Sequence, residues 1–365
     1  MSLKIEMLLR EMVKRGASDL HIKVGISPAF RINGKLHKLI DTRTDQEMMD
    51  GFLSDIMNRE QRSRFEEKKE IDFAIGARNM GRFRINVFRQ RGTVGLVIRH
   101  IKATIPPFSE LHLPEVILDI SMKERGLILV TGTTGSGKST CLAAMVDHIN
   151  QHTSSHIITI EDPIEFLHRD KKSIVTQREI GVDTFSYSEA LRASLRQDPD
   201  VLLVGEIRDL ETMQIALTAA DTGHMVFATI HTTNATETIT RILSMYPPHQ
   251  HEEVRIMLAD CLVGIISMRL LGTKDGKGRV PAAEVMINTA AIREYILDRD
   301  KGSEILGAIA DGHKQYGSQT FDQSILSLYN DGIIEYDVAY QAATNPDDLD
   351  LKIRGIEGTS DRSWM

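Results

Sequence analysis

A glycine-rich stretch has the residue types and spacing of a phosphate-binding loop. Residues 132–139 read Gly-Thr-Thr-Gly-Ser-Gly-Lys-Ser, which fits the pattern G-x-x-x-x-G-K-[ST]. In such a loop the glycines let backbone N–H groups curl around phosphate oxygens, and the helix that follows adds its positive dipole end. Lys138 is expected to reach the β- and γ-phosphates, and the Ser139 hydroxyl is expected to ligate Mg²⁺. The stretch therefore predicts a site for ATP with Mg²⁺.

Both flanks of the loop have the patterns that such a site requires. Residues 126–130, Gly-Leu-Ile-Leu-Val, form a short apolar run typical of a buried parallel strand. After the loop, apolar residues recur every three or four positions, as on one face of a helix: Leu142, Met145, Val146 and Ile149. Strand, loop and helix together make the match specific. The residues expected to bind the nucleotide are Thr133, Thr134, Gly135, Ser136, Gly137, Lys138, Ser139 and Thr140.

Nucleotide hydrolysis also needs a group that activates the attacking water, and an acidic cluster offers one. The apolar run 157–160 leads directly into Glu161-Asp162-Pro163-Ile164-Glu165. Ligands of open α/β sheets bind at the carboxyl ends of strands, where this cluster would lie. Glu161 is the candidate general base, with Asp162 and Glu165 as alternatives; a solvated turn is the functionally neutral interpretation.

A second carboxylate follows the apolar run 201–204, in the manner of a Walker B strand. Gly205-Glu206 stands where many such enzymes carry an aspartate, and the longer glutamate is expected to hold Mg²⁺ through a water. His224 and His231 flank the next apolar run and are candidate phosphate sensors. Their spacing, with no third ligand nearby, does not indicate a metal site. A histidine at a strand end can bond a γ-phosphate or a carboxylate, or can simply pack in the core.

Arginines are concentrated in residues 78–99, and two of them alternate along one predicted strand. Arg82 and Arg84 share a strand face because side chains in a strand repeat every two residues. On an acidic chain, such a face suggests contact with an anion. We expect these two arginines to sense nucleotide phosphates, within one subunit or across an interface; a solvated strand face is the alternative.

The elements around these residues indicate two domains of an α/β protein. Residues 1–100 show a helix at Ile5–Arg15, strands, a charged helical stretch at 45–69 and then alternating antiparallel strands. A proline-containing linker spans 101–114. In residues 115–345, apolar runs at 127–131, 157–160, 201–204 and 225–230 alternate with helical patterns, which is typical of a parallel sheet covered on both faces. We expect the region from Glu252 onward to be helical, with an apolar stripe that includes Phe321 and Leu328, and 346–365 to be a polar tail.

Composition narrows the classes of partner. The net charge of −7 argues against nucleic acid as a partner, and no apolar stretch is long enough for direct membrane insertion. The two cysteines form neither a disulfide framework nor a four-cysteine zinc site, and they suit a cytoplasmic protein.

The motifs taken together resemble the secretion ATPase superfamily of type II secretion and type IV pilus systems, and most closely its pilus retraction (PilT-like) ATPases. The resemblance covers almost the whole chain. The segments that carry it are Ser18–Ile22, Gly81–Arg84, the phosphate-binding loop, Ile160–Glu165, the Walker B segment ending at Glu206, and Thr222–Thr233.

The resemblance implies a homohexameric ring of subunits, each with a PAS-like N-terminal domain and a RecA-like ATPase domain with a helical C-terminal region. It implies ATP between the two domains, Glu161 as general base and Glu206 near Mg²⁺. It also implies a motor that powers pilin filament disassembly at the cytoplasmic face of the inner membrane, with a pilus platform protein and paralogous pilus ATPases as partners. The lack of a four-cysteine module favours retraction over assembly.

Two positions depart from the family pattern, and several functions remain open. The stretch Ala291–Asp298 keeps the Ala-Ile-Arg start of a retraction motif but lacks its second arginine, and Met268 stands where glutamine is common. The alternatives are a pilus-assembly or type II secretion ATPase, a weakly hydrolysing scaffold that modulates a paralogous motor, and a nucleic-acid motor on a similar core.

Overall fold

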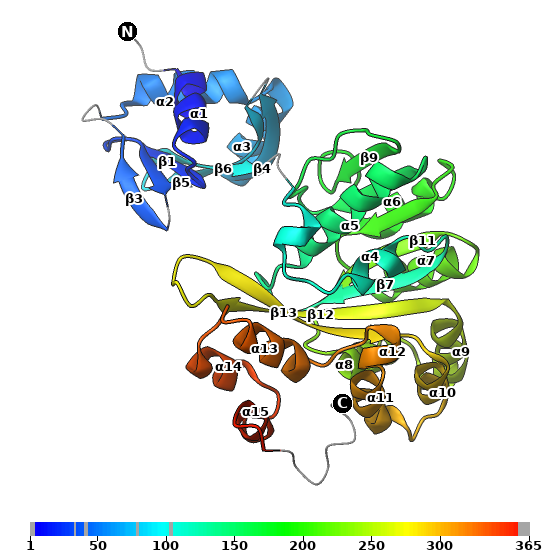
Figure 1. Cartoon of the computed structure of the whole chain (residues 1–365). Helices are drawn as coiled ribbons and strands as arrows, with labels where there is room; N and C mark the ends of the chain where they lie inside the picture. The colour runs from blue at the N-terminus through cyan, green and yellow to red at the C-terminus, as the bar shows by residue number, and fades with distance from the viewer. Residues whose placement is uncertain (1–3, 33, 40–42, 78–79, 102–104, 357–365) are drawn as a thin grey trace. The chain divides into compact units, whose positions relative to one another are not determined.

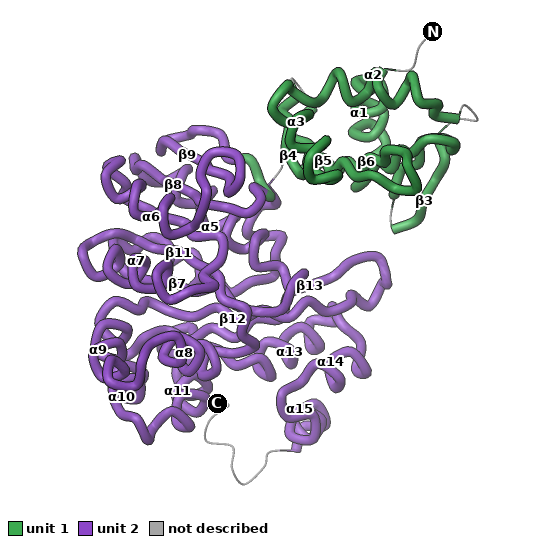
Figure 2. Tube along the Cα trace, turned by 180° about the vertical axis from the view of Figure 1, so that it is seen from behind, with its two compact units in different colours: residues 1–104, 165–167 green, residues 105–164, 168–365 purple. Residues whose placement is uncertain are grey.

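The computed structural model describes residues 4–32, 34–39, 43–77, 80–101 and 105–356 (Figure 1). The chain divides into two compact units, coloured separately in Figure 2. The first comprises residues 1–104 with 165–167, and the second comprises 105–164 and 168–365. Residues 102–104 of the predicted linker and 357–365 of the predicted tail lie outside the described residues.

The first unit is a six-stranded antiparallel sheet with one apolar face. Its strands are hydrogen-bonded in the order β3-β2-β1-β6-β5-β4. Side chains of its helices, such as Met12, Phe52 and Phe65, share one core with strand residues such as Leu20 and Phe83. The elements are α1 (Ile5–Lys14), β1 (Asp19–Lys23), β2 (Ala29–Ile32), β3 (Lys35–Lys38), α2 (Gln46–Ile56), α3 (Arg59–Lys68), β4 (Glu70–Ala77), β5 (Gly81–Gln90) and β6 (Thr93–Ile101).

The sequence predictions for this unit are confirmed for α1 and most strands, with one correction. The stretch 45–69, expected as one helical region, forms two helices separated at Met57 and Asn58. The Asn58 side chain accepts from the Gln61 backbone N–H while the Gln61 side chain accepts from the Asn58 N–H. This reciprocal capping box begins a new helix, so the charged pattern does not run through unbroken.

The second unit is built on a seven-stranded sheet in the order β13-β12-β7-β11-β10-β8-β9. Its strands are β7 (Gly126–Thr131), β8 (His156–Glu161), β9 (Ile174–Glu179), β10 (Val201–Val204), β11 (Met225–Ile230), β12 (Leu262–Gly272) and β13 (Arg279–Ile287). All neighbours are parallel except β12 and β13. The four apolar runs predicted as strands are confirmed.

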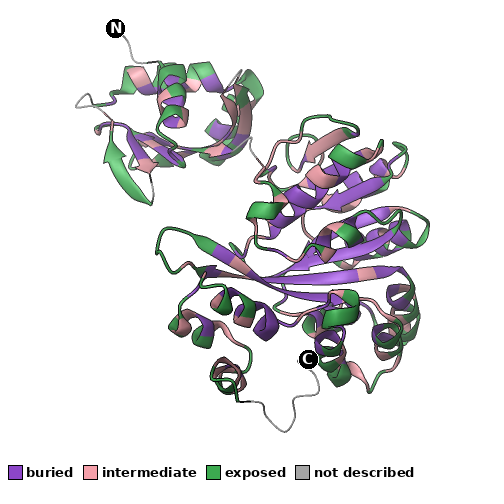
Figure 3. Cartoon of the chain, in the orientation of Figure 1, coloured by how far each residue is buried: buried purple, intermediate pink, exposed green. Residues whose placement is uncertain are grey.

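Helices cover both faces of this sheet, which explains its continuous apolar strands (Figure 3). Alternate residues of β7 divide between the two faces: Leu127 and Leu129 pack on one side, Ile128 and Val130 on the other. The helices are α4 (Val116–Ser121), α5 (Lys138–His152), α6 (Tyr187–Ser194), α7 (Leu210–Asp221), α8 (Ala235–Ser244), α9 (His251–Cys261), α10 (Ala290–Leu297), α11 (Ile305–Asp311), α12 (His313–Tyr316), α13 (Phe321–Asn330), α14 (Tyr336–Ala342) and α15 (Pro346–Ile353), with short 3-10 turns at Phe108–Glu110, Pro248–Gln250 and Gly302–Glu304. No described helix has both the length and the apolar character needed to cross a bilayer.

The prediction of an all-helical region after Glu252 is wrong, because the β12–β13 hairpin lies within it. Helix α9 runs directly into β12, and a fully buried strand has no alternation that distinguishes it from a buried helix. The expected stripe on α13 is confirmed: Phe321 and Leu328 pack with Leu271 of β12 in a separate apolar cluster.

Two segments expected outside the packed units are in fact packed. In the predicted linker, Leu113 is buried in the core of the second unit, with Phe108 packed beside it. The predicted tail begins with helix α15, which the Asn345 side chain caps and which buries Leu349. A few apolar residues anchor each stretch, Phe108, Leu111 and Leu113 in the first and Leu349 and Ile353 in the second, and prolines beside both stretches mask their pattern.

Candidate nucleotide site

The phosphate-binding loop has a backbone that only glycine adopts readily. Gly132, Gly135 and Gly137 have φ values of +137°, +80° and +102°. A Cβ atom at Gly132 would lie 2.5 Å from the Met268 backbone oxygen, so β12 presses directly against the base of the loop. By contrast, a Cβ at Gly135 would meet no atom within 4 Å. The loop is therefore tight at its base and open at its exposed crest.

Lys138 and Ser139 stand in the first turn of α5, where backbone N–H groups have no acceptor within the helix. The Lys138 ammonium donates to the backbone oxygens of Gly132 and Thr133, at 2.7 and 2.9 Å. The side chain is thus bent back over the loop that precedes it. A cation held there, above a set of N–H groups at a helix start, suits an anionic ligand.

The sheet topology brings the other predicted groups to the same edge as the loop. Strands β7, β11, β10 and β8 are consecutive neighbours, and all four run in parallel. Their carboxyl ends therefore lie side by side. The loop at Gly132, then His231, Glu206 and Glu161 follow these ends in that order. Three of the predicted chemical groups thus meet at the edge that also carries the phosphate-binding loop.

Glu206 is held between two positively charged or chargeable side chains. His231 Nε2 lies 3.1 Å from Glu206 Oε1, and Arg208 Nη2 donates to Oε2 at 2.6 Å. The bond from Arg208 and the nearby His231 hold the pKa of this carboxyl below its usual range. Glu206 therefore stays ionised at neutral pH. Of the alternatives left open for His231, the structure shows the contact with a carboxylate.

Glu161 is fixed by neighbours on its own strand and on the edge strand. Thr159 Oγ1 and Gln177 Nε2 both donate to Glu161 Oε1, at 2.6 and 3.1 Å. These two donors fix the rotamer of the carboxylate at the end of β8. Asp162 and Glu165 are the alternative candidates for the general base. Asp162 is exposed and directly follows Glu161, and Glu165 lies on the segment that groups with the first unit.

One aromatic side chain at this edge was not identified from the sequence. Burial raises the pKa of the Tyr187 hydroxyl well above its ordinary value, and the negative charges of Asp162, Glu206 and Glu161 add to the shift. A Cβ at Gly205 would lie 3.1 Å from that hydroxyl and 3.0 Å from the Ile160 oxygen. Glycine before Glu206 thus allows the close approach of Tyr187. Only the fold joins residues so distant in sequence.

His224 lies away from this group. It precedes β11, whereas His231 follows it, and the strand between them spans about 20 Å at 3.3 Å per residue. Its ring Nδ1 lies 3.0 Å from the Ala219 oxygen at the end of α7. Within one chain, the two histidines therefore sit at opposite edges of the sheet, and His224 cannot sense the same phosphate as His231.

Arg82 and Arg84 belong to the first unit, on β5. Both are partly exposed, and they alternate with the buried residues Phe83 and Ile85, so they share the face opposite the core. Arg84 Nε lies 3.7 Å from Asp72 Oδ1 on β4. The register also places Arg84 beside Arg99 of β6. The expected common strand face is confirmed, and the phosphate-sensing role stays a prediction.

The groups present fit a nucleotide with a divalent cation. A hydroxyl at Ser139 and a carboxylate at Glu206 are oxygen ligands of the kind Mg²⁺ prefers, and Mg²⁺ is commonly held by few protein groups together with phosphates and waters. Among the described residues, no cluster of three or more His, Cys, Asp or Glu side chains could hold a metal alone. A cation at this edge would therefore depend on the phosphates for its remaining ligands.

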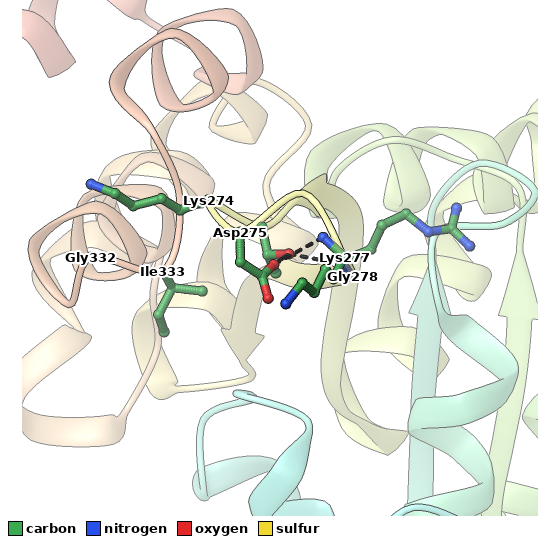
Figure 4. Close-up of a pocket in the computed structure, with 8 residues that line it drawn as sticks. Lys274, Asp275, Lys277, Gly278, Gly332 and Ile333 are labelled. Carbon is green, nitrogen blue, oxygen red and sulfur yellow. Dashed lines mark hydrogen bonds between the residues drawn. The ribbon is translucent and has the colours of Figure 1, made fainter. Parts of the chain in front are cut away.

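A separate groove lies at the far end of the β12–β13 hairpin (Figure 4). It is lined by Lys274, Asp275, Lys277 and neighbouring residues, with Gly332 and Ile333 on the other side. Asp275 accepts from the Lys277 N–H and the Thr273 hydroxyl, which closes a tight turn. None of the predicted site residues lines this groove.

Comparisons with known proteins agree with this geometry. The sequence profile of the family described as "Type II/IV secretion system protein" matches residues 2–319. "Type IV pilus retractation ATPase PilT" of Pseudomonas aeruginosa is 45% identical over 342 residues, covering 94% of this chain and 98% of the relative. "Type IV pilus ATPase PilU" of the same organism is 41% identical over 360 residues, covering 98% and 94%.

A solved structure is similar over the same extent. A crystal structure of "the Pilus Retraction Motor PilT and Bound ADP" matches with a TM-score of 0.88 and 46% identity, covering 95% of this chain and 99% of that one. The phosphate-binding loop, the carboxylates at the strand ends and these full-length similarities lead to one conclusion. The chain belongs to the Type II/IV secretion system protein family.

Proposed function

We propose that this chain is an Mg²⁺-dependent ATPase that powers type IV pilus retraction, the disassembly of pilin filaments that underlies twitching motility. The observation that carries the proposal is the phosphate-binding loop beside two positioned carboxylates, in a chain 45% identical to a PilT protein over nearly its whole length. The proposal includes a PAS-like first unit, a RecA-like second unit and a homohexamer at the cytoplasmic face of the inner membrane. Its partners there are a pilus platform protein and paralogous pilus ATPases.

The catalytic roles follow from the bonding at the strand ends. Glu161, fixed by Thr159 and Gln177, accepts the proton of the attacking water. Lys138 and the first N–H groups of α5 bind the phosphates. Ser139 and Glu206 would hold Mg²⁺, which when bound would offset negative charge on the phosphates. Arg82 and Arg84 contribute further positive charge to the phosphates. When the product phosphate leaves, the negative charge close to His231 and Glu206 decreases. The contact between these two side chains then differs between the ATP-bound and ADP-bound states.

A second candidate is a scaffold that turns over ATP slowly and modulates a paralogous motor. The equally long similarity to PilU, described as a type IV pilus ATPase, fits either candidate. The charged partners of Glu206 and the two donors to Glu161 favour a hydrolysing enzyme. The two candidates therefore differ in turnover and not in nucleotide binding.

The test is ATP turnover per subunit, with Mg²⁺, across a wide range of protein concentration. We expect turnover that rises steeply with concentration, because the sites of a ring are completed between subunits, and none in Lys138→Ala, which also fails to bind ATP. Sizing of the same samples distinguishes a ring already assembled at the lowest concentration. Absence of turnover at every concentration would favour the modulating role. In cells, deletion should abolish twitching and leave excess surface pili; bald cells would indicate assembly instead.

A further inference from the structure

A buried carboxylate outside the predicted site lies on β13, two strands from β7, the strand that leads into the phosphate-binding loop. Glu284 of β13 is 3% exposed. A charge at such depth needs bonded partners, because burial without them is costly. Its Oε1 accepts from the Ala235 backbone N–H at 2.8 Å, its other partners include the Ser267 hydroxyl, and Arg269 supplies positive charge. Burial raises the pKa of Glu284 to about 7, so this carboxyl depends strongly on those few partners.

On one side, these bonds lead to the base of the phosphate-binding loop. Thr131, Ser267 and Glu284 are direct cross-strand neighbours on β7, β12 and β13. The Thr131 hydroxyl donates to Ser267 Oγ at 3.0 Å, which leaves the Ser267 proton for Glu284. Thr131 immediately precedes Gly132. A continuous row of hydrogen bonds therefore joins the buried carboxylate to the residue from which the loop begins.

On the other side, the bonds lead to the segment that carries His231. Ala235 is the first residue of α8, and only three residues separate it from His231. The rest of this short connection is held by α8 itself: Glu237 Oε2 accepts from the Thr233 N–H at 2.8 Å. Helix α8 packs against both β12 and β13. The bond from Ala235 to Glu284 is thus the polar anchor of this helix start on the sheet.

We propose that Glu284 is a positioning residue of the nucleotide site, which fixes the His231 segment relative to the phosphate-binding loop. It acts through two chains of hydrogen bonds. One runs through Ser267 and Thr131 to the loop, and the other runs through Ala235 to the segment of His231, which contacts Glu206. Loss of the carboxylate leaves the loop able to bind nucleotide, since β12 still presses on Gly132. It lets the start of α8 shift, and with it the contact between His231 and Glu206. The inference rests on the proposed assignment of His231 and Glu206 to the nucleotide site.

The test separates binding of ATP from its turnover. We expect Glu284→Ala to lower kcat at least tenfold while KM for ATP stays within about threefold of wild type. Glu284→Gln should recover most of kcat, because its amide oxygen can still accept from Ala235 and its NH₂ can donate to Ser267. A purely structural role would lower kcat no more than in Asp19→Ala. Asp19 is the control, another buried carboxylate, which accepts from Ser18 and Arg99 in the first unit and is not among the charges that act on Glu284.

Further variants keep the inference open to refutation if Glu284→Ala does not fold. Ser267→Ala removes the hydrogen bonds that lead from Glu284 to the loop, and it leaves no large cavity. We expect it to lower kcat, but by less than Glu284→Ala. Two results would overturn the inference. One is a kcat of Ser267→Ala equal to that of wild type, and the other is a kcat of Glu284→Gln as low as that of His231→Ala. Glu206→Gln is the reference variant. If it loses turnover while Glu284→Ala keeps it, only the inference is wrong; if it keeps wild-type turnover, the site assignment fails and the inference with it.

Discussion

The role of Glu206 can be tested by replacing its carboxylate with an amide of the same shape. Glu206→Gln keeps the side chain in place but removes its negative charge. In the structure that charge is bonded to Arg208 at 2.6 Å and lies 3.1 Å from His231. The Arg208 side chain is 64% exposed, so the pair contributes at most about 1 kcal/mol to folding. The melting temperature should therefore fall by no more than about 4 °C.

The effect on chemistry should be much larger than the effect on stability. In the proposed site Glu206 would act by holding Mg²⁺, and loss of one preorganised electrostatic contribution to a reaction typically lowers kcat by about 10²–10³, or roughly 3–4 kcal/mol. We expect a loss of that size in ATP turnover, with ATP affinity within about threefold of wild type, because Lys138 and the loop are unchanged. Phosphate release at saturating ATP measures the turnover, and titration with a fluorescent nucleotide measures the affinity.

A matched control is available on α7. Glu211 pairs with Arg192 at 2.7 Å, and both side chains are more than half exposed. Glu211→Gln makes the same chemical change at an exposed ion pair that is bonded to neither Glu206 nor Glu161, so its turnover should equal that of wild type. A turnover within threefold of wild type in Glu206→Gln would refute the assignment of this carboxylate to the reaction. So would equal turnover losses in the two variants.

Two further predictions concern the loop and acid stability. Gly132→Ala should weaken ATP binding at least tenfold and lower the melting temperature, because its Cβ would lie 2.5 Å from the Met268 backbone oxygen. Gly135→Ala is the control, because the space around its Cβ is open. It should lower the free energy of unfolding only by the roughly 1–2 kcal/mol of left-handed backbone strain. Similar melting temperatures for the two variants would contradict this. Burial lowers the pKa of His168 from 6.5 to about 4. As pH falls below 6.5, this histidine therefore takes up a proton in the unfolded chain before it does so in the folded one. The free energy of unfolding should decrease between pH 6.5 and 4, by at most about 1.4 kcal/mol per pH unit. Urea unfolding followed by circular dichroism should show a shallower decline in His168→Gln, and parallel declines would exclude the histidine as the cause.

The local part of the site was predictable because it is encoded in consecutive residues. The phosphate-binding loop, with strand β7 before it and α5 after it, reads directly from spacing and apolar pattern. Glu161 and Glu206 were predictable because each ends an apolar run, and parallel strands end at a common edge. The contact of His231 with a carboxylate followed from the same rule. His224 flanks the same strand at its start, and the rule for carboxyl ends does not extend to that position.

The partners of these groups were not predictable, because they come from segments distant in sequence. Gln177 stands on an edge strand whose residues are mostly half-buried, so β9 has no apolar run to reveal it. Tyr187 and Glu284 reach the site only through the order of strands in the sheet. Strand β12 was mistaken for helix because it is buried on both faces. A single sequence shows neither strand order nor which polar residue lies beneath a helix.

The position of β7 within its sheet has a consequence for synthesis of the chain on the ribosome. This strand lies between β11 and β12, and Thr131 pairs with Ile230 and Ser267, which are translated about 100 and 136 residues later. While only the first half of the second unit has emerged, both hydrogen-bonding edges of β7 lack their partners, and such apolar edges invite pairing with other chains. Both edges of β7 can therefore be paired only after β12 has left the exit tunnel. Translation speed across residues 140–270 thus sets how long an aggregation-prone intermediate persists.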